Sequence, residues 1–130
     1  MVNIATGKVR NNFEIEYFIK HLINFSDLHF ALLLYYNNPV ESLKVAGINP
    51  EELKRQQGGE ERIFQQVFKD VNFELIKIAG KELNEVGFTS KDLPVSRATT
   101  SMSAYDHLTN NYLTSLGRGF VNFCLDQYSE

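Results

Sequence analysis

The chain has 130 residues, of which 43% are hydrophobic, including 10 phenylalanines and 6 tyrosines; this is enough apolar side chain for the core of one domain and excludes a disordered protein. Its 13 basic and 16 acidic residues are spread along the chain and leave a net charge of −3, so a basic surface for nucleic acid is not expected. The single cysteine, Cys124, cannot form an internal disulfide, which favours a reducing, cytoplasmic setting.

The sequence shows the pattern of neither a secretory signal nor a membrane span. Asparagine and charged residues interrupt the first 18 residues, where a signal peptide needs an apolar run. The longest apolar run, residues 28–36, is about half of the roughly 20 residues that a transmembrane helix requires. We therefore expect no membrane partner, and a buried helix at this run.

The first third of the chain predicts two helices. In residues 13–23, apolar residues alternate as in a strand but also recur at helical spacing. We favour a helix because no second convincing strand is available to pair with this one, although the choice stays open for residues 8–20. Residues 26–36, SDLHFALLLYY, are apolar nearly all round, which is typical of a central helix, and Ser26 is the expected N-cap.

The pattern Asn-Pro occurs twice in residues 37–59, at Asn38 and Asn49. An asparagine side chain can accept a hydrogen bond from a free amide of the first helical turn, and proline at the first helical position has no amide to leave unpaired. Glycines follow each segment, at Gly47 and at residues 58–59, where they suit the left-handed residue that ends a helix. We therefore predict two short helices here, each too short to be stable without packing on a larger element.

Residues 60–86 carry the most regular pattern in the chain. Apolar residues step by three and four through this segment, at Phe64, Val67, Phe68, Val71, Leu75, Ile78, Ala79, Leu83 and Val86. The pattern predicts one long amphipathic helix whose apolar stripe faces the core, with a dimer seam as the alternative use of the stripe. Gly80 lies inside this helix at a cost of about 1 kcal/mol relative to alanine, so a kink there, or two helices, is the other interpretation.

The last third begins with a long tract of little periodicity, residues 87–102, which contains Pro94. A simple connection is the leading interpretation, although long ordered loops carry function more often than short ones. A helix is expected again after Ser103, its proposed N-cap, and a last short helix is expected around Phe120, Phe123 and Cys124. The whole chain, residues 1–130, is thus predicted to be an all-α, compact single-domain bundle of about six to seven helices.

We predict no catalytic residue, cofactor or metal site. The histidines His21, His29 and His107 include no pair at the spacing that places two metal ligands on one helical face. His29 is expected to be a core or capping residue. Nucleotide-binding and serine-nucleophile motifs are absent, and Cys124 has no flanking base. The runner-up hypothesis is a small helical enzyme in which the three histidines and Asp106 converge from distant positions.

The segment SDLHFALLLYYNNPVESLKVAGINPEELKRQ, residues 26–56, resembles one repeat of the double-repeat N-terminal domain of Clp/Hsp100 ATPases. Ser26 stands at the capping position of that repeat, His29 at its histidine and residues 32–34 at its leucine run. A weaker similarity covers residues 93–121. The chain departs from the pattern because Leu28 replaces the usual glutamate and no second His-Leu-Leu-Leu run follows.

The resemblance implies an all-helical module without ATPase activity, which binds substrates, adaptors or peptides in grooves between its helices. An amphipathic partner helix laid in an apolar groove is the natural mode of binding. Tyr35 and Tyr36 are the candidate partner-binding residues, because adjacent helical positions are not expected to face the core together and a partly exposed tyrosine is a frequent anchor. The simpler alternative is that both rings cap the core with their hydroxyls in water.

The resulting functional hypothesis is a non-enzymatic protein-interaction module, either an adaptor or a partner in a larger bacterial-type assembly. Its expected partner is a protein or peptide, not nucleic acid or membrane. Besides the small enzyme, a structural protein that forms a homodimer through the long helix remains an alternative.

Overall fold

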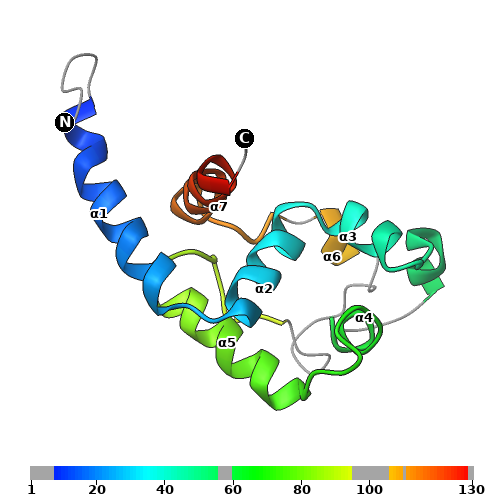
Figure 1. Cartoon of the computed structure of the whole chain (residues 1–130). Coiled ribbons are helices and arrows are strands. Elements are labelled where there is room, and N and C mark those ends of the chain that lie inside the picture. Colours follow the sequence, from blue (N-terminus) through cyan, green and yellow to red (C-terminus); the bar gives the residue numbers. More distant parts are fainter. Residues whose placement is uncertain (1–7, 56–59, 95–105, 110, 129–130) are drawn as a thin grey trace.

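The computed structural model describes residues 8–55, 60–94, 106–109 and 111–128 (Figure 1), and the structural statements below refer to these residues. They form, in chain order, α1 (Lys8–Asn24), α2 (Asp27–Asn37), α3 (Pro39–Val45), the 3-10 helix η2 (Pro50–Arg55), α4 (Glu61–Val67), α5 (Phe73–Glu85), α6 (Asp106–Thr109) and α7 (Ser115–Tyr128). No strand is present within these ranges, where the only β-type pairing is an isolated bridge between Thr89 and Leu113. The all-α prediction is confirmed.

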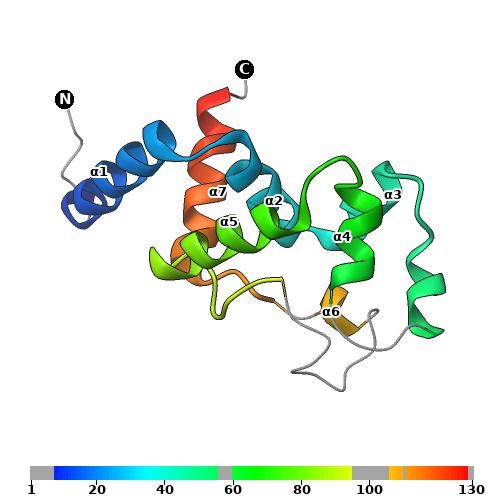
Figure 2. The same ribbon diagram turned by 90° about the horizontal axis from the view of Figure 1, so that it is seen from below.

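Helix α2 lies in the middle of the molecule, as Figures 1 and 2 both show. It contacts α3, α5 and α7. Because it has neighbours on several sides, it buries most of its circumference, including Leu32, Leu33, Tyr35 and Tyr36, while Leu34 keeps 49% of its surface exposed. The apolar run in residues 28–36 therefore forms a central helix, as predicted.

Helix α1 confirms the helical interpretation of the N-terminal segment and excludes the strand alternative for it. Its C-terminal half packs on the body of the protein through Phe18 and His21, and the Tyr17 hydroxyl donates a hydrogen bond to the carbonyl of Val86 at 2.7 Å. Its N-terminal end extends away from the other helices in both ribbon views (Figures 1 and 2).

The first Asn-Pro pair starts a helix as predicted. The Asn38 side chain accepts a hydrogen bond from the amide of Glu41 at 3.3 Å. Helix α3 ends at Val45, and Gly47, whose φ is +80°, follows just after its end. The second pair starts a 3-10 helix, because the Asn49 side chain caps the amide two residues on, that of Glu51, at 3.0 Å. The glycines predicted to end this segment, residues 58–59, lie outside the described residues.

The prediction of one long helix over residues 60–86 is wrong. Helix α4 ends at Val67 and α5 begins at Phe73, so the chain turns between them at residues 68–72. Asn72 causes this new start, since its side chain accepts a hydrogen bond from the amide of Glu74 at 2.8 Å and so offers the backbone an alternative to helix continuation. The two helices pack against each other, as Figure 2 shows.

The tract after α5 is an ordered connection as far as it is described. The Ser90 amide donates to the carbonyl of Tyr112 at 2.8 Å, and the Thr114 amide donates to the carbonyl of Phe88 at 3.0 Å, so the tract runs beside residues 112–114. The Thr114 side chain then accepts from the amide of Gly117 at 2.9 Å and caps α7. The expected N-cap Ser103 lies outside the described residues, and α7 begins earlier than the predicted last short helix.

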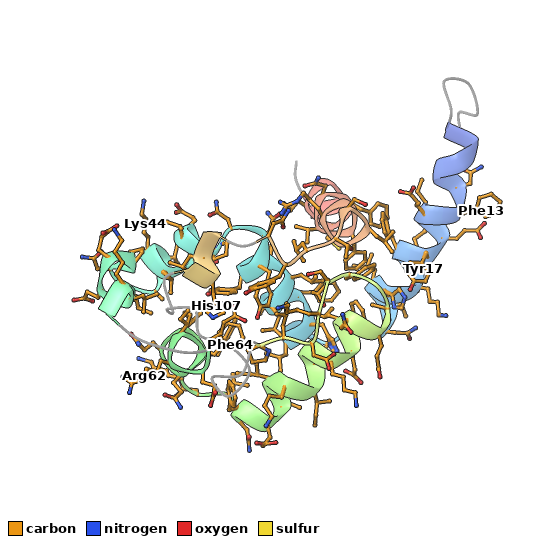
Figure 3. All side chains as sticks on the ribbon, turned by 180° about the vertical axis from the view of Figure 1, so that it is seen from behind. Phe13, Tyr17, Lys44, Arg62, Phe64 and His107 are labelled. Carbon is orange, nitrogen blue, oxygen red and sulfur yellow. The ribbon has the colours of Figure 1, made fainter. Side chains whose placement is uncertain are left out.

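One continuous core, rich in aromatic rings, holds the helices together (Figure 3). Around Phe88, rings from α1, α7 and the α1–α2 turn meet, namely Tyr17, Phe18, His21, Phe25 and Phe120. A second group of rings surrounds Phe64 of α4, where Tyr35 and Tyr36 of α2 pack against it. No described helix is long and apolar enough to cross a membrane.

Candidate functional site

The two tyrosines predicted to bind a partner are buried. Tyr35 is 2% exposed and Tyr36 is 3% exposed, so the expectation that they are partly exposed is wrong. The reason is the central place of α2, whose several neighbours cover adjacent positions of the helix. The Tyr35 ring packs edge-on against Phe64, with centroids 5.0 Å apart. Neither ring offers a surface to a partner in this fold.

Tyr36 belongs to a buried polar cluster between α2, α4 and α6. Its hydroxyl donates a hydrogen bond to Glu60 Oε1 at 2.9 Å, and its ring lies against Tyr112, whose hydroxyl is 2.7 Å from His107 Nδ1. Burial, and after it the charge of Glu60, raises the pKa of the Tyr35 and Tyr36 hydroxyls well above 10. The tyrosines stay protonated near neutral pH, which keeps Tyr36 a hydrogen-bond donor to the carboxylate.

His21 and His29 both stack on the ring of Phe25. The ring centroids of His21 and Phe25 are 4.9 Å apart, those of Phe25 and His29 are 4.7 Å apart, and both pairs are stacked. His29 also confirms its predicted capping role, because its Nδ1 accepts from the backbone amide of Ser26 at 3.1 Å. Its Nε2 lies 2.7 Å from Glu82 Oε1, which ties α2 to α5.

Ser26, His29 and Glu82 form a hydrogen-bonded chain with the residue types of a hydrolytic triad. Ser26 Oγ is 2.8 Å from His29 Nδ1, and His29 Nε2 is 2.7 Å from Glu82 Oε1. These bonds also close the N-terminus of α2 and fasten it to α5, which accounts for them without any reaction. His107 lies apart from this chain, in the cluster around Tyr112, so the convergence of histidines that the enzyme hypothesis needs is not observed for the described side chains.

No group of three histidine, cysteine, aspartate or glutamate side chains suited to a metal ion occurs in the described part of the chain. The side chain of Asp106, the remaining member of the enzyme hypothesis, is outside the description.

The titration of His21 gives the fold a measurable pH dependence. Burial, and after it the charge of Lys20, lowers the pKa of His21 below its ordinary value of 6.5. The unfolded chain therefore binds a proton at this position more readily than the folded chain, and stability is lost as the pH falls below about 6.5.

We expect His21→Phe, which keeps a ring against Tyr17, Phe25 and Phe88, to lose less stability than the wild-type protein between about pH 7.5 and pH 5.5. Urea unfolding at the two pH values measures this difference. Equal losses in the two proteins would contradict the assignment to His21.

An apolar groove runs between α2 and α7, the two helices marked near the centre of Figure 1. It encloses about 140 Å³, and every lining side chain is apolar except for one thiol: Phe30, Leu33, Leu34, Phe120, Val121, Cys124 and Leu125. Leu34 and Leu125 are 49% and 47% exposed. Burial raises the pKa of the Cys124 thiol, which makes it a weak nucleophile.

Sequence reasoning missed this groove because its two walls are far apart in the sequence. The signal available in the sequence was the run of residues 28–36, which carries apolar side chains all round the helix. Each side of such a helix needs a covering element, and a side that is incompletely covered forms a groove. Comparison with protein-family models, with curated proteins and with solved structures finds no match for the chain.

Proposed function

We propose that this chain is a small helical protein-interaction module that holds an amphipathic helix of a partner protein in the groove between α2 and α7. The observation that carries the proposal is the groove itself, which is lined by apolar side chains and has the half-exposed Leu34 and Leu125 in its lining. Exposed apolar surface of this kind marks binding sites more often than isolated apolar residues do.

The size and the walls of the groove restrict what it can bind. Small-molecule sites usually enclose about 300–1,000 Å³, whereas this groove encloses about 140 Å³ and suits only a few apolar side chains. Both walls are helices, whose backbone groups are already paired, so an extended peptide would find no strand edge to pair with. A partner helix that inserts apolar side chains spaced by three and four residues meets both conditions.

The finer role, an adaptor or partner in a Clp-type assembly, rests on the resemblance of residues 26–56 and stays a prediction. Leu33 and Leu34, from the leucine run that carries the resemblance, line the groove, which supports binding at this place. A cytoplasmic location stays an expectation from the single cysteine.

The homodimer through the predicted long helix is less well supported than binding in the groove. The segment forms two helices, and Phe64, Ala79 and Leu83 of the predicted stripe are buried in the core. The expectation that the whole stripe faces the core is wrong for Leu75 and Ile78, which are 52% and 55% exposed.

The test uses Cys124, the only cysteine of the chain, as a reporter inside the groove. Amphipathic helical peptides that bind the protein are selected from a display library, and each is then tested for slowing the reaction of Cys124 with a thiol reagent. We expect the bound peptide to protect Cys124 and expect Leu34→Asp and Leu125→Asp each to weaken binding about tenfold or more, because each buries a charge against the peptide.

Val45→Asp is the matched control, since Val45 is 79% exposed and belongs to α3, which does not line the groove. This variant should bind like the wild-type protein. Peptides that bind without protecting Cys124 would place the site elsewhere, and a library that yields no binder would contradict the proposed function.

A further inference from the structure

Helix α1 carries a stripe of three exposed isoleucines, Ile15, Ile19 and Ile23, which we call the isoleucine stripe. They are 37%, 43% and 75% exposed. Their spacing of four residues places them above one another on a single helical face. Tyr17, Phe18 and His21, which contact the body of the protein, lie on another face.

This face belongs to a helix with little other support. Among the described helices α1 packs mainly on α7, and its N-terminal end extends away from the body (Figures 1 and 2). The end of a helix that leaves the body gains little from packing, whereas most helical stability in proteins comes from packing of an amphipathic face. A cover over the isoleucine stripe would stabilise α1 and remove apolar surface from water.

We propose that the cover is a second copy of this chain, with the two α1 helices antiparallel about a two-fold axis at Ile19. Under that axis the stripe is complementary to itself, because Ile19 faces Ile19 of the second copy and Ile15 faces Ile23 of the second copy. Such an arrangement is isologous, the commonest symmetry of soluble dimers. The groove between α2 and α7 does not enter the argument, so this inference is independent of the proposed function.

The charges beside the stripe favour the same antiparallel register. Glu16 and Lys20 are exposed and lie on one flank of the stripe, one helical turn apart. A two-fold axis brings this flank against the same flank of the second copy, so Glu16 approaches Lys20 of the second copy at two symmetric places. Neither side chain forms an ion pair with another described residue, so both are available for these contacts.

The expected dimer is weak. Two helices of this length bury less than the roughly 1,200 Å² of a standard interface, which is the range of transient complexes. We therefore expect a dissociation constant within about 5–500 μM, and sedimentation equilibrium of the full chain over these concentrations measures it. The wild-type protein should change from monomer to dimer across this range.

Two charge reversals test the register. In Glu16→Lys the flank of each copy carries two lysines, and in Lys20→Glu it carries two glutamates. The flanks that face each other then have the same charge, so each variant alone should dimerise about tenfold more weakly than the wild-type protein. An equimolar mixture of the two variants should recover wild-type association, because every cross-chain pair is then opposite in charge. Both variants keep a negative net charge, so attraction between whole molecules does not explain such a recovery.

Ile19→Glu provides an independent variant at an exposed position and should leave the protein monomeric with its helical content unchanged by circular dichroism. Three results would overturn the inference: a wild-type protein that stays monomeric throughout, a mixture that associates no better than its components, or an Ile19→Glu variant that dimerises like the wild-type protein.

Discussion

Replacing Gly80 with alanine is expected to lower the free energy of unfolding by about 3 kcal/mol or more, although alanine favours a helix over glycine by about 1 kcal/mol. Gly80 lies within α5 and is buried, and a Cβ added there would overlap the backbone carbonyl oxygen of Leu93. The obstacle is main chain, which cannot rotate away as the end of a flexible side chain can. Either α5 or residues 88–94 must then shift.

The connection after α5 has little room to make that shift. Leu93 and Phe88 are buried, and Thr89 pairs with Leu113 in the isolated bridge. A displaced Leu93 would therefore disturb the packing of both its neighbours and the approach to α7. Urea unfolding followed by circular dichroism measures the loss.

Gly119→Ala is the matched control for this prediction. Gly119 is also helical, but a Cβ added there would lie 3.5 Å from the Phe18 ring, an ordinary contact. This variant should be as stable as the wild-type protein or more stable by up to about 1 kcal/mol. A Gly80→Ala protein as stable as Gly119→Ala would mean that residues 88–94 do not pack against α5 as described.

Local chemistry accounts for the parts of the fold that could be predicted from the sequence. Ser26 and Asn38 begin helices because their side chains pair with groups within four residues, so the signal and the structure are close together in the chain. Asn72 acts in the same way, on the amide of Glu74. The sequence does not reveal this start, because the apolar stripe continues through residues 68–72 with unbroken helical spacing and so predicts one helix.

Exposure could not be predicted in the same way, because it depends on how many elements surround a helix. Tyr35 and Tyr36 are both buried because α2 has neighbours on several sides. The apolar run predicts a central helix, but it does not indicate which positions of that helix stay uncovered. The reverse error applies to Leu34, which belongs to the same run and yet is half exposed in the groove.

The contact between His29 and Glu82 shows most directly what cannot be predicted from the sequence. The two residues are 53 positions apart, and their hydrogen bond joins α2 to α5 at 2.7 Å. The sequence indicated a capping role for His29, which concerns one ring nitrogen, and contained nothing about the partner of the other nitrogen.

Replacing Phe88 with alanine is expected to lower the free energy of unfolding by about 3–5 kcal/mol, the range for truncation of a buried phenylalanine. Phe88 is fully buried, and its ring lies 4.7 Å from that of Phe120, 5.5 Å from that of His21 and 5.9 Å from that of Phe25, measured between centroids. These contacts join α7, α1 and the turn before α2 at one side chain, so the resulting cavity would weaken several helix contacts at once. Urea unfolding measures the effect.

The control is the same truncation on the surface. Phe13 is 74% exposed and points away from the body of the protein (Figure 3), so Phe13→Ala should change stability by no more than about 0.5 kcal/mol. Phe88→Leu should fall between the two, since leucine fills part of the cavity. If Phe88→Ala cost no more than Phe13→Ala, the aromatic cluster would not be what fastens α1 to the body. The isoleucine stripe would then have no fixed place from which to meet a second copy.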